Sequence, residues 1–196
     1  DLEPVHIQQT VDLKNQIVET GKVRHIGLSN ETPWGLSEFI NVSERDNLPR
    51  VQSVQNAYNL LNRSYESGMS EFFHRSSVGL LAYSPLAQGY LSGKYLDGKL
   101  PEGSRTKLFG RGQRYETPSA EAAIRKYLDL AGQSDLDPSL MANAFVNSRE
   151  FVTSNIIGAT TMEQLEIAIK SGLTKLSDDV IGELDKIHSE CPNPCP

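Results

Sequence analysis

Cysteine, tryptophan and long apolar runs are scarce in this sequence. Its 196 residues include two cysteines and one tryptophan. A structural zinc site takes about four His or Cys ligands, and no cluster of these residues provides them. No apolar stretch approaches the roughly 20 residues that span a membrane as a helix. We therefore expect no metal site and no membrane association.

Blocks of like charge are missing as well, although the net charge is -6. A nucleic-acid-binding or membrane-surface role therefore has no support, and we expect no nucleic-acid partner. Residues 1–9 have neither the basic start nor the apolar stretch of a signal peptide. We expect that the chain begins inside a longer reading frame and that its location is cytoplasmic or plastid.

The two cysteines, Cys191 and Cys195, lie in a Pro-rich tail at residues 190–196. Two interpretations stay open: a pair of exposed free thiols, or a local disulfide. Neither interpretation involves the core of the protein.

What is present is an alternation of helical periodicity and short apolar runs. With 38% hydrophobic residues the chain can form a real core, and we expect a single domain over residues 1–196. The predicted strands are 23–28, 51–55, 78–83 and 154–158. The predicted helices are 9–19, 34–45, 65–75 and 120–131, with three more beginning at Asp137, Thr161 and Ser177.

Strands that alternate with helices predict an α/β fold with parallel strands. Four such units are half of a (β/α)8 TIM barrel, which takes eight units in about 250 residues. A small open α/β sheet is the alternative. A half barrel leaves two strand edges unpaired, which favours association. We therefore predict that the chain pairs with another copy through these edges or belongs to a longer protein.

A long segment at about 84–118 is predicted to be irregular, and loops of that length are usually functional. It carries a basic stretch within an acidic protein, consisting of Lys94, Arg105, Lys107, Arg111 and Arg114. Cations on a mobile loop suit phosphate recognition, so this segment is a candidate phosphate-binding loop. A solvated surface loop is the alternative interpretation.

The active sites of parallel α/β barrels lie at the carboxyl ends of the strands. The predicted strands end in Ser29-Asn30, Gln55-Asn56, Tyr83-Ser84-Pro85-Leu86 and Gly158-Ala159-Thr160-Thr161. Small polar groups beside one aromatic ring would suit a planar, amide-bearing heterocycle such as nicotinamide. The free N–H groups of the helix that follows Gly158 would suit an anion. These polar residues could equally be caps of strands and helices.

Three motifs in order and spacing resemble the aldo-keto reductase family. They are residues 21–30 (GKVRHIGLSN), residues 81–95 (LAYSPLAQGYLSGKY) and residues 156–165 (IIGATTMEQL). They are similar to the segments around the fifth, seventh and eighth strands of the family's barrel. Residues 29–33 and 59–64 also resemble its Tas-like subgroup, which is related to the potassium-channel β subunits. The resemblance covers about residues 9–190 and identifies the chain as the C-terminal half of the barrel.

The resemblance implies a binding site for NADPH or NADP. The residues that would contact this cofactor are Ser29, Asn30, Gln55, Tyr83, Ser84, Leu86, Gln88, Gly89, Lys94, Arg105, Gly158, Thr160 and Gln164. Ser29, Asn30 and Gln55 would hold the carboxamide of the nicotinamide, and Tyr83 would stack on the nicotinamide ring. Lys94 and Arg105 would meet phosphates, and Thr160 and Gln164 would contact the 2′-phosphate region.

Two departures from the family weaken the expected binding. Ala168 and Ile167 stand where the family often has polar residues near the adenine. The family's catalytic Asp, Tyr, Lys and His come from its first four strands, which this chain lacks. None of the four histidines lies at a predicted strand end. We expect no catalytic residue here and weak or absent NADPH binding by the chain alone.

Two functions remain open at this point. The resemblance implies an NADPH-dependent oxidoreductase that reduces small aldehydes or ketones in the intact parent protein, with this chain supplying the cofactor-binding half. The alternative is a non-catalytic binding, storage or inhibitor-like module that keeps the partial barrel.

Overall fold

Four parallel strands form the centre of the molecule, as the sequence predicts. The structure is a computed structural model that describes residues 6–110 and 113–195. The strands are β1 (Ile26–Ser29), β2 (Val51–Ala57), β3 (Gly79–Tyr83) and β4 (Val152–Ile156), in the spatial order β1-β2-β3-β4. The main helices are α1 (Ile7–Glu19), α2 (Pro33–Arg45), α3 (Met69–Ser76), α5 (Pro118–Gln133), α6 (Pro138–Asn147), α7 (Met162–Leu173) and α8 (Asp178–Glu190).

Each strand extends only as far as its neighbour offers a pairing partner. For this reason the bounds of β1 and β4 differ from the predicted ones. β1 begins at Ile26 rather than at residue 23, because Ile26 pairs with Val51, the first residue of β2. β4 covers Val152–Ile156 rather than 154–158, because Ile156 pairs with Tyr83, the last residue of β3. Apolar residues alone do not mark the point where a pairing partner stops.

Capping residues begin the helices as expected. Asp137 accepts a hydrogen bond from the N–H of Leu140 at 2.9 Å, with Pro138 in the first turn. Thr161 and Ser177 are the caps of α7 and α8. The predicted helix at 65–75 is interrupted instead, because Gly68 has a φ of 100°, and α3 begins only at Met69.

The segment at 84–118 is folded rather than irregular. It contains η2 (Ala87–Ser92), η3 (Leu96–Gly98), α4 (Arg105–Phe109) and η4 (Gln113–Tyr115). Three buried tyrosines pack within it: the ring centroid of Tyr90 lies 4.7 Å from that of Tyr95 and 5.6 Å from that of Tyr115. The prediction missed this because Gly and Pro suggest loops, whereas these aromatic side chains order the segment.

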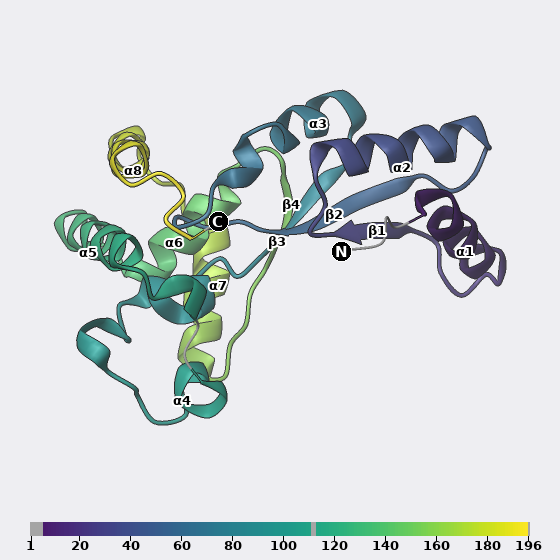
Figure 1. The fold of residues 1–196 in the computed structure, drawn as a ribbon. Helices are drawn as coiled ribbons and strands as arrows, with labels where there is room; N and C mark the ends of the chain where they lie inside the picture. Colours follow the sequence, from purple (N-terminus) through teal and green to yellow (C-terminus); the bar gives the residue numbers. More distant parts are fainter. Residues whose placement is uncertain (1–5, 111–112, 196) are drawn as a thin grey trace.

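Helices cover the strands unequally (Figure 1). α1 and α2 lie beside β1 and β2 at one end of the molecule, and α5, α6 and α8 lie together at the other. α6 is buried from Leu140 to Val146 and packs against α5, α7 and β4. Val54 and Leu80, which pair across β2 and β3, are fully buried, whereas Ser29 and Gln55 in the next row are exposed. The sheet therefore has a packed face and an open face.

The two edges of this sheet, β1 and β4, carry no further strand in the described residues. A cavity of about 400 Å³ opens between β4 and α7. Ile169, which lines this cavity, is 60% exposed, and Leu173 at the end of α7 is 87% exposed. Beside β1, Leu13 and Ile17 of α1 are also exposed. Both edges therefore present apolar side chains to solvent.

The tail is docked against the protein. Cys195 is only 2% exposed, and its backbone N–H donates to the carbonyl oxygen of Leu61 at 3.1 Å. The side chain of Asn193 accepts a hydrogen bond from the N–H of Arg63 at 2.7 Å. Cys191 and Cys195 are both free. The exposed-thiol interpretation is therefore wrong for Cys195, and the local disulfide is absent.

Over the described residues, no helix has both the length and the apolar character needed to cross a membrane.

Candidate functional site

The carboxyl ends of β1, β2 and β3 are joined by hydrogen bonds. The phenol of Tyr83 donates to Oδ1 of Asn30 at 2.8 Å. The backbone N–H of Asn30 donates to the carbonyl oxygen of Gln55 at 2.9 Å, and the hydroxyl of Ser29 donates to the same oxygen at 3.3 Å. Four residues predicted to surround a nicotinamide therefore do lie together.

Left-handed backbone turns follow two of these strands. Asn30 has a φ of 53° and Ser84 a φ of 56°. Asn tolerates this conformation better than most residues, which explains its place directly after β1. Both turns lie at the carboxyl ends of the strands, where the chain leaves the sheet.

Asn56 and Asn59 order the loops around these turns, a role that the sequence did not predict for either residue. Asn56 accepts from the N–H of Glu31 at 3.1 Å and donates to the carbonyl oxygen of Glu31 at 2.9 Å. Asn59 is fully buried and donates to the carbonyl oxygen of Ser84 at 2.9 Å. A buried asparagine within an apolar run was the available signal.

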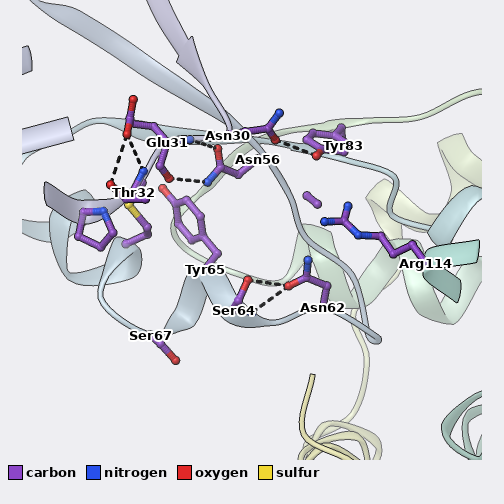
Figure 2. Close-up of a pocket in the computed structure, with 13 residues that line it drawn as sticks. Asn30, Glu31, Thr32, Asn56, Asn62, Ser64, Tyr65, Ser67, Tyr83 and Arg114 are labelled. Atoms are coloured by element: carbon purple, nitrogen blue, oxygen red, sulfur yellow. Dashed lines mark hydrogen bonds between the residues drawn. The ribbon is translucent and has the colours of Figure 1, made fainter. Parts of the chain in front are cut away.

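A pocket of about 270 Å³ opens beside the joined strand ends (Figure 2). Its wall is formed by the ends of β2 and β3, the β1–α2 loop, the β2–α3 loop, the start of α3 and one arginine of the 84–118 segment. The polar residues that line it are Asn30, Glu31, Thr32, Asn56, Asn62, Ser64, Ser67, Tyr65, Tyr83 and Arg114. Two of the predicted cofactor residues, Asn30 and Tyr83, therefore also face this pocket.

The cations of the 84–118 segment have different surroundings. Lys94 lies over Gly89, so that a Cβ atom at that glycine would be 2.8 Å from Cε of the lysine. The ammonium also lies 5.1 Å from the ring centroid of Tyr95. Arg105 is exposed, and its guanidinium lies 5.8 Å from the ring centroid of Phe109.

The three other cations of this segment also differ in their surroundings. Lys107 forms an exposed ion pair with Glu102 at 2.5 Å, Arg114 lines the pocket, and Arg111 lies outside the described residues. The predicted basic stretch is therefore not one continuous patch.

The backbone of η2 bends sharply through the predicted pyrophosphate region. Gln88 and Gly89 have φ angles of 57° and 97°. Leu86 is half-buried, and its carbonyl oxygen accepts the N–H of Gly89 at 2.8 Å. This turn exposes Gln88 and keeps Gly89 close to Lys94.

Beyond β4, Thr160 and Gln164 form a local pair. The side-chain oxygen of Gln164 accepts the backbone N–H of Thr160 at 2.9 Å and its hydroxyl at 3.2 Å. Thr161 caps α7 by accepting the N–H of Gln164 at 3.3 Å. Gly158 is exposed just before this pair. Ala168 lies on the same helix and lines the cavity at the β4 edge.

Several buried groups among the described residues are poor candidates for a proton donor. Burial raises the pKa of Tyr65 to about 12 and also raises the pKa values of Tyr58 and Tyr127. His188 lies on α8 with a pKa that burial and Arg63 lower. His6, His25 and His74 are exposed away from the pocket wall. Over the described chain, no group of at least three His, Cys, Asp or Glu residues could hold a metal.

Comparison with known proteins identifies the relatives of this chain. The sequence pattern of the aldo/keto reductase family matches residues 3–189. The chain belongs to the aldo-keto reductase family. Its four βα units are part of that family's barrel, and its relatives include the Tas-like proteins.

Three relatives show which kinds of protein this chain is similar to. "Protein tas" of Escherichia coli K12 is 42% identical over 192 residues, which cover 98% of this chain and 56% of that protein. "L-glyceraldehyde 3-phosphate reductase" of the same strain is 33% identical over 84% of this chain and 49% of its own length. A "putative voltage-gated potassium channel subunit beta" of Schizosaccharomyces pombe is 28% identical, over 96% of this chain and 57% of its own length. The chain thus spans about half the length of these relatives.

Proposed function

We propose that this chain supplies the cofactor-binding part of an NADPH-dependent oxidoreductase that reduces small aldehydes or ketones. The observation that carries the proposal is the bond between Tyr83 and Asn30, with Ser29 and Gln55 beside it. Reductases among its relatives support the same reaction class. We keep a cytoplasmic or plastid location, and a single domain over 1–196, as predictions.

The donor set at the strand ends fits a nicotinamide. Ser29, Asn30 and Gln55 offer hydroxyl and amide groups that match a carboxamide, and the half-buried ring of Tyr83 offers a stacking face. When bound, the reduced nicotinamide would supply hydride to a carbonyl carbon. The residues of this chain would orient it by fixing the plane of the amide and covering one face of the ring.

The phosphate-bearing part of the cofactor would extend along the 84–118 segment. Ser84, Leu86, Gln88 and Gly89 would line its path, with Lys94 and Arg105 as the cations. The Thr160–Gln164 pair after Gly158 would take the 2′-phosphate region. Arg and Lys suit this task because both donate charge-assisted hydrogen bonds to phosphate oxygens.

The proton for the carbonyl oxygen would come from outside this chain. Efficient general acids have pKa values near the working pH, and burial moves Tyr58, Tyr65 and Tyr127 away from it. We therefore expect the chain alone to bind the cofactor weakly and to turn over no substrate.

Titration of the 196-residue chain with NADPH, followed by NMR, tests the proposal. We expect a Kd weaker than about 1 μM, with signals of the Asn30 and Gln55 side chains shifting. Tyr83→Ala should weaken binding, whereas Lys107→Gln, which changes an ion-paired surface cation, should not. A submicromolar Kd, a robust rate of carbonyl reduction, or no shift at the strand ends would contradict the proposal.

We also propose that the chain self-associates through its exposed strand edges. Over the described residues, the outer edges of β1 and β4 carry no further strand, so they offer free backbone groups near apolar side chains. Size-exclusion chromatography with light scattering should detect a dimer or larger species. Ile169→Lys at the β4 edge should shift it toward monomer, and Phe109→Ser, 78% exposed elsewhere, should not. A clean monomer at all concentrations would rule this out.

A further inference from the structure

Asn59 connects the β2–α3 loop to both ends of the 84–118 segment. The residue is fully buried, and its Nδ2 atom donates to the carbonyl oxygen of Ser84 at 2.9 Å. Burial raises the pKa of Tyr115, while the charge of Arg114 and a hydrogen bond from the side chain of Asn59 oppose the rise. A hydrogen bond that lowers the pKa of a phenol is one donated to its oxygen, so both N–H groups of the amide are used. One side chain therefore holds the start and the end of the segment.

The oxygen of the same amide fixes it to a tight turn of the β2–α3 loop. Oδ1 of Asn59 accepts the N–H of Leu61 at 2.9 Å and the N–H of Asn62 at 3.0 Å. The backbones of Asn59 and Asn62 also exchange two hydrogen bonds of 3.0 Å each. The tail braces this turn, because the N–H of Cys195 donates to the carbonyl oxygen of Leu61. Since the donors and the acceptor of the Asn59 side chain are all engaged, its orientation is fixed.

The carbonyl group of Ser84 begins a strained stretch of backbone. The same oxygen also accepts the N–H of Ala87 at 2.8 Å. The φ angles of Ser84, Ala87 and Gln88 are 56°, 48° and 57°, in the left-handed region that a Cβ atom disfavours. Residues other than glycine keep this conformation only where their surroundings hold them, and such residues gather at ligand sites. The amide of Asn59 is one such support, because it fixes the carbonyl group on which the turn is built.

This strained turn coincides with the proposed path of the cofactor phosphates. Ser84, Gln88 and Gly89 are among the residues proposed to line it, and the turn keeps Gly89 close to Lys94. A flexible segment would lose conformational freedom when the cofactor ordered it, and that loss would weaken binding. A turn that is already held in place avoids most of this cost.

Aromatic packing orders the segment internally, and Asn59 relates it to the sheet. The ring of Tyr90 packs against those of Tyr95 and Tyr115, and all three belong to the segment itself. Asn59 instead follows closely after β2. The residue before it, Tyr58, donates its backbone N–H to the carbonyl oxygen of Tyr83 at 3.3 Å. The bonds of Asn59 therefore place the segment relative to the strand ends proposed to hold the nicotinamide.

We propose that Asn59 is a positioning residue for the cofactor, which fixes the 84–118 segment against the strand ends so that the phosphate path is formed before NADPH binds. Because Asn59 is fully buried, it acts through Ser84 and Tyr115 rather than by contact with the cofactor. The proposal rests on the proposed function, since it concerns the same cofactor site.

Amide hydrogen exchange of the free 196-residue chain, followed by NMR, tests the proposal without a ligand. Asn59→Ser keeps an oxygen that can accept the N–H of Leu61 and removes both amide donors. We expect the N–H groups of Ala87 and Gly89 to exchange about tenfold faster in this variant, because the support of the turn is lost.

Asn143→Ser is the matched control, since it makes the same change at another buried asparagine. Asn143 is 2% exposed, donates to the carbonyl oxygen of Ser139 at 3.0 Å and accepts from Asn155 at 3.2 Å. This variant should also lower the melting temperature. The exchange of Ala87 and Gly89 should nevertheless stay within about twofold of the unchanged chain, because their turn keeps its support.

NADPH titration of the same variants measures the effect on the cofactor. We expect the Kd to be about tenfold weaker for Asn59→Ser. Tyr115→Phe, which keeps the ring and loses only the phenol oxygen, should weaken it about threefold. Asn143→Ser should bind as the unchanged chain does.

The pattern of the NMR shifts separates positioning from a general loss of stability. At saturating NADPH, the shifts of the Asn30 and Gln55 side chains should persist in Asn59→Ser. The shifts of the Gln88 and Gly89 amides should shrink, because only the phosphate part of the cofactor loses its prepared contacts.

Unchanged exchange at Ala87 and Gly89 in Asn59→Ser, or an equal increase in Asn143→Ser, would overturn the proposal. Unchanged NADPH affinity in Asn59→Ser would overturn it as well. If Asn59→Ser does not fold, the same measurements on Tyr115→Phe decide. NADPH that shifts no signal in the unchanged chain would contradict the proposed function, and the exchange rates would still show whether Asn59 holds the segment.

Discussion

Tyr83 donates a 2.8 Å hydrogen bond to Asn30 and thereby connects the ends of β3 and β1 across the intervening β2. The acceptor residue is itself held in a left-handed turn, with a φ of 53°, and its backbone N–H is bonded to Gln55. Three strand ends therefore meet at one asparagine. This arrangement gives the side chain of Asn30 a fixed orientation before any ligand binds.

Replacing Asn30 tests the two parts of this arrangement separately. Asn30→Gly loses the bond from Tyr83 and keeps the left-handed turn, so it should destabilise the chain by about 0.5–1 kcal/mol. Asn30→Ala loses the bond and also strains the turn, which should cost about 1 kcal/mol more. Urea denaturation measures both values. Equal stability of the two variants would show that the left-handed turn carries no strain.

A steric prediction concerns the contact between β3 and β4. A Cβ atom at Gly79 would lie 1.8 Å from Oγ1 and 3.0 Å from Cβ of Thr153. The register between these strands shifts between Leu80 and Leu81, where Thr153 is the residue left without a pairing partner. Gly79→Ala should therefore destabilise the chain by about 1–3 kcal/mol.

The double variant Gly79→Ala/Thr153→Ala identifies the cause. Removing the hydroxyl and the methyl of Thr153 should recover part of the loss, so the two changes should couple favourably in a denaturation cycle. Additive effects would mean that the glycine is required for a reason other than this contact.

The strands and helices were predictable because they depend on short-range patterns. Alternating apolar runs and capping residues such as Asp137 mark them directly. Their ends were less predictable, because β1 and β4 stop where the neighbouring strand stops. That information lies in residues distant along the chain.

The candidate site was predictable only in part for the same reason. Ser29, Asn30, Gln55 and Tyr83 follow from the rule that sites lie at strand ends. The pocket beyond them was missed, because Tyr65 and Arg114 are separated by the whole of β3 and most of the 84–118 segment. Their meeting depends on the packing of Tyr115 and its neighbours, which no local pattern signals.

The two cysteines should differ in reactivity. Burial raises the pKa of the Cys195 thiol to about 11, and thiolates are the reactive form. Cys191 is less buried. Iodoacetamide at about pH 8 should therefore modify Cys191 first and Cys195 only after unfolding in urea. Peptide mass spectrometry measures both sites, and equal labelling of the folded chain would mean that the tail is not docked.

A partly buried charge cluster around Arg63 connects α8 to the β2–α3 loop and should set the stability in acid. Arg63 lies 2.8 Å from Glu66 and 2.7 Å from Asp185. Burial alone would raise the pKa of Glu66, but hydrogen bonds from Arg63 and Tyr58 outweigh it, and the pKa is lowered. Stability from Glu66 is therefore present above its ordinary pKa of 4.5 and is lost as the pH falls through the lower folded value.

His188 should add a second loss of folding stability, which sets in at a higher pH than the loss due to Glu66. Burial first, and the charge of Arg63 next, lower its pKa below the ordinary 6.5, while Glu66 and Asp185 oppose this. The unfolded chain therefore binds the proton more readily. The contribution of His188 is complete above pH 6.5 and is lost as the pH falls toward the folded pKa.

His188→Gln should flatten the dependence of stability on pH below 6.5 and leave the later loss near the carboxylate range unchanged. His74→Gln, an exposed histidine on α3, is the matched control and should follow the unchanged chain. Urea denaturation at a series of pH values from about 7.5 to 4 measures the curves. Identical curves for His188→Gln and the control would show that the cluster does not hold His188 neutral in the folded protein.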